Sequence, residues 1–488
     1  MAEKNLIVAV YDFRGKQEYI YRTNRVKEIM GASEIIRTAF SDAIGAFDGR
    51  VDDDKDKAFS VDGFVSGGFD GAVLYEGGGN LVMLFRDDEK YLAFNKSFSW
   101  WLINNAPGLA PVCGAFGFSD LKNTGFKEVT EKIFGNQNEY KRLAAPFAEA
   151  NVLPFTQIDR KSTQPVVKKV SVPEEKSLTE ESVKKLEKFD TIVLGGEQEL
   201  DKLVHRRGVE SLLAVIHIDG NSMGKRVKEY IKEGASFEEG VNLQREFTKK
   251  IDDAFVNNPL EAIRKIAGTI SVSEDKDTKT VKMREIVGAG DEITIVCNAR
   301  KALEITLEYF KSLDASNKEQ GQNYSACAGV AICHSHAPFS DVYEIAKQCC
   351  DSGKDRIREL GEAAQNHCYF DAYFCGGAIT GTLEELRARQ ETGRTRMPYC
   401  VYGEDERHDF ESGFARVGKE LSRLSRTPVK GLRDIAFRSR TELELELTRI
   451  KSGFTEDREL DLTAEDREIL YDVTTFFDLW YSEEKENA

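Results

Sequence analysis

The sequence predicts an α+β fold in which one arrangement of strands and helices occurs twice and is followed by a helical region. Two apolar runs, residues 6–15 and 212–224, each contain an aspartate and precede a helical pattern. Each is followed by two apolar runs around a glycine-bearing turn, at 71–85 and 284–297, which is typical of a β-hairpin. A length of 488 residues allows about three domains at roughly 150 residues each.

The first copy begins with the apolar run that leads to Asp12, and apolar residues at helical spacing come next. Its hairpin turn contains Gly79. The pattern then predicts a helix over about 88–105, a strand over 111–118 and a helix over about 126–144.

The second copy repeats this order after Asp219, with Gly290 in the hairpin turn. The pattern then predicts a helix over about 299–314, a strand over 325–334 and a helix over about 339–355. This is the split β-α-β, ferredoxin-like order of an antiparallel sheet with helices on one face. We therefore expect two ferredoxin-like domains in tandem.

The rest of the chain differs in character from the two copies. Between them the sequence is charged and broken by Pro165 and Pro173, and beyond about residue 380 it has helical spacing and ends in an acidic tail. The expected organisation is a first domain over 1–150, a charged linker or small subdomain over 151–205, a second domain over 206–380 and a C-terminal helical domain over 381–488.

Charge and cysteine content exclude several classes of protein. The net charge of −16 repels nucleic-acid backbones, so a non-specific coat of DNA or RNA is not expected, and any bound phosphate must be held locally. Nine cysteines without a CxxC pair argue against a disulfide scaffold and a four-thiolate zinc site. No apolar run reaches the roughly 18 residues of a membrane span, and no signal-peptide pattern is present, so we expect a cytoplasmic protein without a membrane partner.

The second copy brings carboxylates to one end of its predicted sheet. Asp219 ends the first strand, and Asp291 and Glu292 occupy the hairpin turn. Three such groups repel one another unless a cation joins them, and oxygen ligands suit Mg²⁺ or Mn²⁺. Two metal ions at this place would support an in-line phosphoryl transfer. Taken alone, Asp219 is more typical of a helix cap, and Asp291 and Glu292 are often only a solvated turn, so the prediction depends on their joint occurrence.

The flanking residues fit a nucleoside triphosphate. The segment from Gly220 to Gly224 opens the next helix, where backbone N–H groups can bind phosphate oxygens. Lys225 lies in the first turn of that helix, and Lys354 ends the later helix, so both could face the β- and γ-phosphates. Gly290 allows the hairpin turn to approach a ligand closely. Either lysine alone would be read as a surface residue.

The first copy keeps only part of this set. Asp12 is retained, but the hairpin turn over 76–80 has Asn80 where a carboxylate would fall. One carboxylate does not readily hold two metal ions, whereas the glycines of the turn still allow a nucleotide to lie against it. We therefore expect nucleotide binding without catalysis in the first copy.

Three segments of the second copy together resemble a known family. DGNSMGK (219–225), GAGDE (288–292) and the segment 324–354 are similar to the catalytic palm domain in the large subunit of type III CRISPR effectors, a domain related to the GGDEF nucleotide cyclases. Residues 11–33 resemble the first, degenerate palm of that subunit. The segment 158–167 resembles a remnant of the insertion between the palms, without its zinc-binding cysteines.

The resemblance implies a two-palm nucleotidyltransferase that converts ATP into cyclic oligoadenylate messengers in antiviral defence, with Mg²⁺ or Mn²⁺. The metal ligands that it implies are Asp219, Gly220, Asp291 and Glu292. The residues that would bind the triphosphate are Gly220, Asn221, Ser222, Met223, Gly224, Lys225, Gly290 and Lys354, and the turn with Gly78 and Gly79 would line the acceptor side.

The family's second aspartate of the first motif is Asn221 here, and the first glycine of its hairpin turn is Ala289. No HD nuclease segment precedes Asp12 in this sequence, so we expect a minimal or stand-alone relative without DNA cleavage. Nucleoside triphosphates are the expected partners, and effector subunits or guide and target RNA stay open. Two alternatives also stay open, a catalytically quiet scaffold subunit of an RNA-guided complex and a GGDEF-type cyclase that makes a cyclic dinucleotide from GTP.

Overall fold

A computed structural model describes residues 5–143, 155–159, 163–170, 176–192, 202–204, 210–231, 233–273, 276–377, 379–389, 395–453 and 460–482. The expected acidic tail and much of the expected linker lie outside these residues. The chain forms two compact units. The first comprises 1–193, 222–253 and 289–291, and the second comprises 194–221, 254–288 and 292–488.

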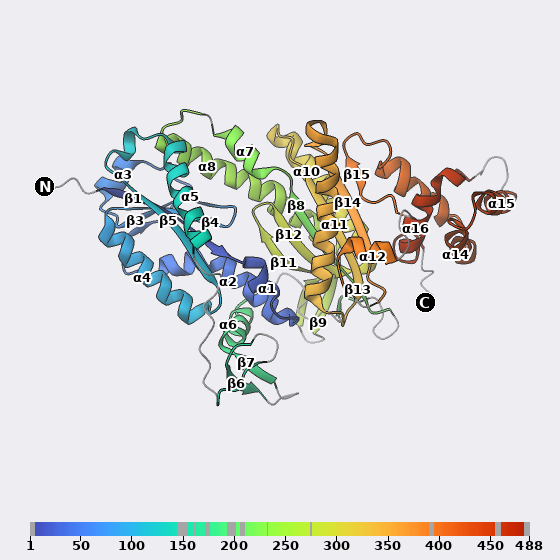
Figure 1. Ribbon diagram of the computed structural model, residues 1–488, viewed down its shortest axis with the longest axis horizontal. Coiled ribbons are helices and arrows are strands. Elements are labelled where there is room, and N and C mark those ends of the chain that lie inside the picture. Colours follow the sequence, from blue (N-terminus) through green and yellow to red (C-terminus); the bar gives the residue numbers. More distant parts are fainter. Residues whose placement is uncertain are drawn as a thin grey trace. The chain divides into compact units, whose positions relative to one another are not determined.

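The first unit contains a five-stranded sheet in the order β2-β3-β4-β1-β5 (Figure 1). Its strands are β1 (Leu6–Arg14), β2 (Val51–Asp52), β3 (Gly71–Gly77), β4 (Asn80–Phe85) and β5 (Ala110–Phe118). β1 is antiparallel to both of its neighbours, β4 and β5. β3 and β4 form the expected hairpin, in which Gly78 and Gly79 have φ values of 57° and 74°, a region that glycine adopts readily.

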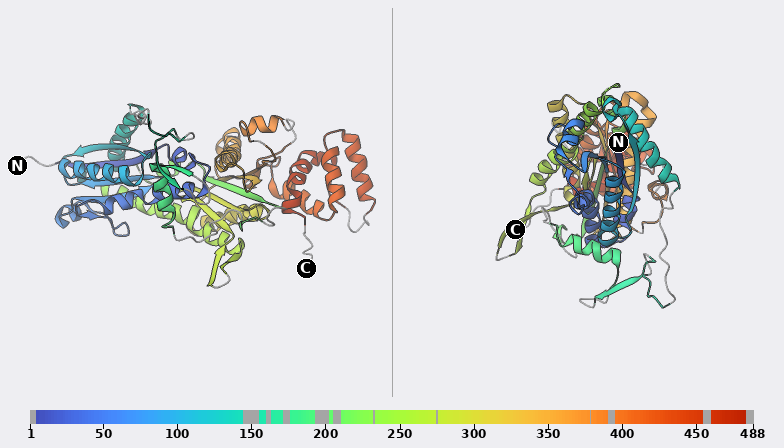
Figure 2. Two further views of the ribbon diagram at one scale, coloured as in Figure 1. Left: turned by 90° about the horizontal axis from the view of Figure 1, so that it is seen from below. Right: turned by 90° about the vertical axis from the view of Figure 1, so that its left-hand side faces the viewer.

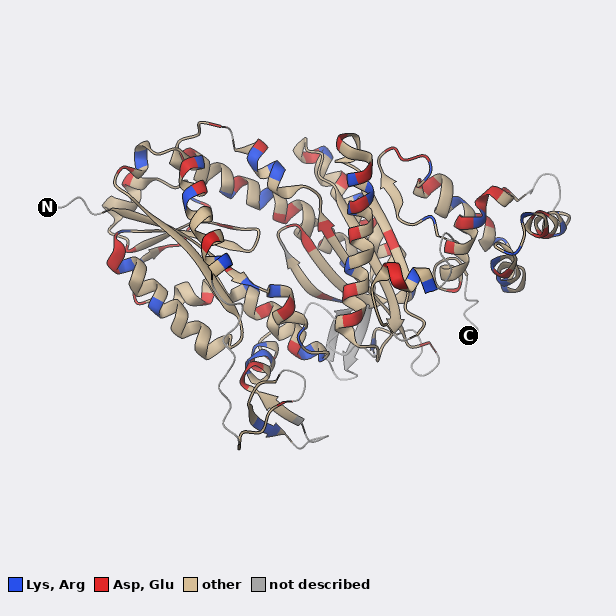
Figure 3. Ribbon diagram, viewed as in Figure 1, with Lys and Arg blue, Asp and Glu red and all other residues tan. Residues whose placement is uncertain are grey.

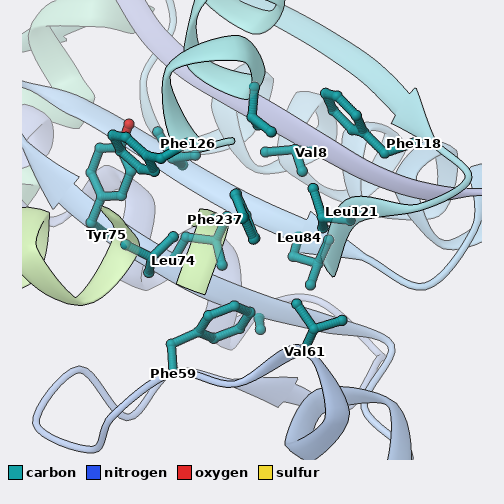
Figure 4. Packing of buried hydrophobic residues seen from close by; sticks show 14 of the residues in the cluster. Val8, Phe59, Val61, Leu74, Tyr75, Leu84, Phe118, Leu121, Phe126 and Phe237 are labelled. Carbon is teal, nitrogen blue, oxygen red and sulfur yellow. The ribbon is translucent and has the colours of Figure 1, made fainter. Parts of the chain in front are cut away.

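Helices cover both faces of this sheet. On one face Tyr11 and Phe13 of β1 pack against Phe94 and Phe98 of α4 (Asp88–Asn105). On the other face the side chains of β1 that point the opposite way join the cluster shown in Figure 4, with α5 (Phe126–Leu143) and α8 (Phe237–Asp252). The expectation of helices on one face is therefore wrong for this sheet, because α5 and α8 add a second layer. The remaining helices of the unit are α1 (Lys16–Tyr21), α2 (Val26–Gly45), α3 (Val61–Gly67), α6 (Glu180–Phe189) and α7 (Met223–Tyr230).

The charged segment between the copies contains regular structure. β6 (Val166–Val170) and β7 (Lys176–Thr179) form a hairpin, and α6 packs on α2. The ammonium of Lys185 is fully buried, 2.5 Å from a carboxylate oxygen of Glu181 and 2.6 Å from the carbonyl oxygen of Tyr19. A buried cation with two close acceptors anchors α6 on the first unit.

The second unit contains a six-stranded sheet in the order β11-β12-β8-β13-β14-β15. These strands are β8 (Leu212–Gly220), β11 (Met283–Ala289), β12 (Glu292–Asn298), β13 (Ala326–His334), β14 (Cys368–Phe374) and β15 (Tyr399–Tyr402). β8 is antiparallel to β12 and β13, and β14 runs parallel to β13. The chain is thus an α+β protein, as predicted. A second hairpin is formed by β9 (Thr269–Ser273) and β10 (Lys276–Val281).

Two features of this unit differ from the sequence prediction. α11 (Phe339–Leu360) continues five residues beyond its expected end, so Lys354 lies within the helix and does not end it. The region expected to be purely helical contributes β15 to the sheet, because its apolar residues pair with β14.

The other helices of the unit are α9 (Asn258–Ile266), α10 (Ala302–Gln320), α12 (Leu383–Arg389), α13 (Arg416–Ser422), α14 (Arg426–Ile435), α15 (Arg440–Lys451) and α16 (Arg467–Trp480). α13 to α16 lie together in Figure 2. Among the described residues, no helix is long and apolar enough to cross a membrane.

The same helix–strand contact occurs in both units. A Cβ atom on Gly114 of β5 would lie 2.1 Å from the carbonyl oxygen of Ile133, and one on Gly329 of β13 would lie 1.9 Å from the carbonyl oxygen of Ala346. Each glycine therefore allows the helix that follows the strand to pack directly on the strand backbone.

This close packing places a lysine at the end of each central strand. Lys141 of α5 lies 2.9 Å from a carboxylate oxygen of Asp12, and Lys354 of α11 forms an ion pair with Asp219. The aspartate near the end of β1 thus pairs with a lysine from the helix after β5, and the aspartate near the end of β8 pairs with a lysine from the helix after β13.

Candidate functional site

Two carboxylates lie side by side at one end of the second sheet. Asp219 of β8 is the direct cross-strand partner of Glu292 of β12. Directly opposed residues of an antiparallel pair project to the same face, with Cβ atoms about 4.5–5.5 Å apart. β8 and β12 contain no other Asp, Glu, Lys or Arg, and Figure 3 shows the strands as mostly tan.

Lys354 supplies a cation to this pair. Its ammonium bonds to a carboxylate oxygen of Asp219. Burial by itself lowers the pKa of Lys354, but the charge and hydrogen bond of Asp219 outweigh it and leave the pKa above its usual value. The lysine is therefore charged at neutral pH, and the end of the sheet carries both signs of charge.

Two further side chains lie beside Glu292, and the sequence analysis missed both. Only Tyr343 bonds to the carboxylate, because Nδ1 of His217 pairs with the hydroxyl of Thr294 over 3.1 Å. The hydroxyl of Tyr343 donates to Glu292 over 3.4 Å, and Nδ1 of His217 lies 3.8 Å from the same carboxylate oxygen. Burial lowers the pKa of His217 to about 4, so the ring is neutral at physiological pH. His217 lies two residues before Asp219, and this period-two spacing is the signal that could have found it.

Asn221 anchors the end of β8. Its side-chain amide donates to the hydroxyl of Ser325 over 3.1 Å and to the carbonyl of His367 over 3.2 Å. Its own backbone N–H donates to the carbonyl of Ser325 over 2.8 Å. The residue is 4% exposed, so it holds the strand end in place and offers little surface to a nucleotide.

The predicted phosphate-binding segment begins at the turn after β8. Ser222 has φ 58° and lies at the start of α7. The N–H groups of Met223 and Gly224, the first two residues of that helix, have no partner within it. The N–H of Lys225 is already bonded to the carbonyl of Ser222, and its exposed ammonium lies 3.9 Å from Glu229. Met223 and Gly224 therefore offer the more open backbone of this segment.

The first unit contains a pocket of about 870 Å³ that gathers several predicted residues. The glycine turn of the β3–β4 hairpin, α5, α7 and α8 form its walls. The lining residues include Gly77, Gly78, Asn80, Phe126, Lys127, Met223, Gly224, Lys228, Phe247, Asp252, Gly290 and Asp291. Of these, Gly78, Met223, Gly224, Gly290 and Asp291 were predicted from the sequence.

Asp252, at the end of α8, is a lining residue that the sequence analysis missed. Burial raises its pKa to about 6, against an opposing hydrogen bond from the backbone N–H of Gly290. Through this hydrogen bond, the Asp252 carboxyl group ties the turn between β11 and β12 to α8 within the pocket. Only the fold brings α8 to this turn, so no sequence signal identified it.

The residues present fit part of the expected metal site. The carboxylate oxygens of Asp219 and Glu292 are donors that Mg²⁺ and Mn²⁺ prefer, and Asp219 already accepts a cation in Lys354. Among the described residues, however, no group of three or more His, Cys, Asp or Glu side chains is arranged to hold a metal ion. The three-carboxylate, two-metal site therefore stays a prediction.

The fold is that of the large subunit of type III CRISPR effectors, which confirms the predicted resemblance at the level of the fold. The solved structures with this fold are of Csm1, alone and in Csm1–Csm4 cassettes. A structure of an apo Csm1–Csm4 cassette matches with a TM-score of 0.55 and 13% identity, covering 98% of this chain and 70% of the other. The cassette with one ATP gives a TM-score of 0.55 at 12% identity and the same coverage. Csm1 of T. onnurineus gives 0.52 at 12% identity, with 97% and 70% covered.

In sequence comparisons, no protein-family model matches the chain, and no curated protein matches it. The similarity therefore concerns the fold.

Proposed function

We propose that this chain is a metal-dependent nucleotidyltransferase that makes cyclic oligoadenylate from ATP in antiviral defence. The proposal rests above all on the opposed carboxylates of Asp219 and Glu292, with Lys354 beside them. The fold supports it, because similar Csm1–Csm4 cassettes have been solved with ATP, AMPPNP, cA3 and cA4. In this proposal the two sheets belong to two palm domains in tandem, the first degenerate and the second catalytic.

The donor ATP would be held at the end of the second sheet. Lys354 would balance the charge of its phosphates, and Asp219, Glu292 and Asp291 would hold Mg²⁺ or Mn²⁺. The metal, when bound, would offset the charge on the reacting phosphate. Tyr343 would keep the Glu292 carboxylate oriented for this task, because its hydroxyl donates to the Oε1 atom.

We further propose that the pocket of the first unit binds a nucleotide. Its volume of about 870 Å³ falls in the range of small-molecule sites. Aromatic and aliphatic side chains could cover the base, while Lys127, Lys228 and the first turn of α7 are suited to phosphate. The glycine turn leaves room for a ligand against the backbone.

The reaction would be a phosphoryl transfer. The 3′-hydroxyl oxygen of the attacking nucleotide bonds to the α-phosphorus of ATP, the bond from that phosphorus to the β-phosphate bridging oxygen breaks, and pyrophosphate leaves. The hydroxyl proton passes to water. Holding both nucleotides in position supplies much of the rate.

Other subunits are possible partners of the chain. The similar structures are Csm1–Csm4 cassettes, which favours a Csm4-like partner here. A requirement for guide or target RNA would fit the same assembly. We expect the protein in the cytoplasm.

The test is to incubate the purified chain with each nucleoside triphosphate and Mn²⁺ or Mg²⁺ and to identify products by mass spectrometry. Cyclic oligoadenylate is expected from ATP, and none from Asp219→Asn or Glu292→Gln. Glu285→Gln is the matched control, because Glu285 belongs to the same hairpin but pairs with Arg264.

Each other outcome points to a different protein. A cyclic dinucleotide from GTP would indicate a GGDEF-type cyclase. No product from any triphosphate, even with partner subunits and RNA added, would indicate a scaffold subunit and would contradict the proposal. Full activity of Glu292→Gln would contradict the assignment of the site.

A further inference from the structure

The carboxylate near the end of the first sheet's central strand is occupied by the chain's own cations. The ammonium of Lys16 lies 2.6 Å from one oxygen of Asp12, and that of Lys141 lies 2.9 Å from the other. The Asp12 side chain is about one-seventh exposed. A divalent metal ion at this carboxylate would face two ammonium groups at close range, which Coulomb repulsion disfavours.

Lys16 also holds the glycine turn. Its ammonium donates to the carbonyl oxygen of Gly79 over 2.8 Å, so one side chain links the end of β1 to the β3–β4 turn. A Cβ atom on Gly79 would lie 2.2 Å from this ammonium, so the close approach depends on glycine at this position. Lys141 contacts Asp12 and Gln137 but is not bonded to the turn.

The same turn forms a wall of the pocket in the first unit. Gly77, Gly78 and Asn80 line that pocket, and a Cβ atom on Gly77 would lie 2.7 Å from the hydroxyl of Thr248 on α8. The turn is thus held between Lys16 on one side and α8 on the other. Glycines with positive φ are otherwise among the least restrained residues of a chain.

The second sheet differs at the matching place. Four residues after Asp219 comes Met223, where Lys16 follows Asp12 by the same interval. Lys354 pairs with Asp219 as Lys141 pairs with Asp12. The position that corresponds to Lys16 is Met223, which has no charge.

We propose that Lys16 is a positioning residue of the nucleotide pocket, a built-in cation that clamps the Gly77–Asn80 turn to Asp12 without a metal ion. The claim that the clamped turn serves a nucleotide rests on the proposed function above. The clamp keeps the Gly77–Asn80 turn ordered before a nucleotide binds. Binding then loses less conformational entropy, so the affinity for the nucleotide is higher, although Lys16 does not touch the reacting atoms.

The test compares Lys16→Met with Lys141→Met. Both remove one cation from Asp12, but only Lys16→Met releases the turn. In EDTA, amide hydrogen exchange at residues 78–80 should become at least tenfold faster in Lys16→Met and change less than twofold in Lys141→Met. Lys16→Arg, which keeps a cationic donor, should restore most of the protection. Thermal unfolding shows whether each variant is folded.

The functional arm measures the dissociation constant and KM for ATP. Lys16→Met should raise both roughly tenfold with kcat nearly unchanged, as expected for loss of one charge-assisted hydrogen bond. Equal exchange rates in the two lysine variants would overturn the clamp. Faster exchange without any loss of ATP affinity would overturn its role in the pocket. If the unaltered protein binds no ATP, the proposed function fails, and the exchange rates still decide the clamp.

Discussion

Gly329→Ala is expected to separate α11 from β13 and to disturb the Asp219–Lys354 pair. The new Cβ atom would lie 1.9 Å from the carbonyl oxygen of Ala346 and 2.3 Å from the backbone nitrogen of Cys350. An ordinary contact begins at 3.4 Å, so the helix must retreat by about 1.5 Å. Both clashing atoms are backbone, and no side-chain rotation relieves them.

The expected cost follows from this displacement. Overpacking of a buried contact usually costs about 1–3 kcal/mol, and a backbone clash falls at the upper end. Lys354 lies one helical turn beyond Cys350, so it moves with the helix and its bond to Asp219 is stretched. We expect the variant to lose about 3 kcal/mol of stability and most of its activity.

The assay is urea denaturation followed by intrinsic fluorescence, with ATP turnover measured in parallel. Gly431→Ala is the matched control, because a Cβ atom there would meet nothing within 4 Å and the site lies inside α14. The control should unfold at an equal or slightly higher urea concentration, since alanine favours helix by up to about 1 kcal/mol. An unchanged unfolding midpoint for Gly329→Ala would refute the close-packing argument.

Three further changes test other parts of the structure. The pKa of Asp252 is raised in the folded protein from 3.8 to about 6, so the folded state binds more protons between about pH 4 and 6 and stability falls as pH rises through this window. Asp252→Asn should flatten this slope and raise the free energy of unfolding at pH 8 by up to about 3 kcal/mol. Urea unfolding at each pH measures both effects, and a slope identical to that of the unaltered protein would contradict the assignment. Arg387→Met leaves the fully buried carboxylate of Asp371 without its guanidinium partner and should cost about 3–5 kcal/mol, whereas the double variant with Asp371→Leu should recover most of that loss. Lys354→Met should lower kcat/KM for ATP at least tenfold, and Lys347→Met on the same helix should not.

Much of the local structure followed from residue patterns. The apolar runs before Asp12 and Asp219 are buried strands, and both hairpins and the helices that follow them lie near their expected bounds. Apolar runs and glycine turns are local signals, and for this reason they could be read in advance.

Other features required the fold. β15 joins the second sheet by pairing with β14. α8 lines the pocket of the first unit, although the sequence analysis assigned no functional residue to that helix. Such contacts join residues far apart in sequence, and local patterns do not record them.

The sequence by itself determined which acids and glycines end the strands, and hence the α+β class and the chemical type of the candidate site. Only the tertiary structure decided that Glu292 faces Asp219, because a shift of one residue in strand register would have placed Asp291 there instead. It also decided which lysine reaches which carboxylate. Those distances depend on how closely a helix packs on Gly114 or Gly329, and a packing distance is a property of two segments together.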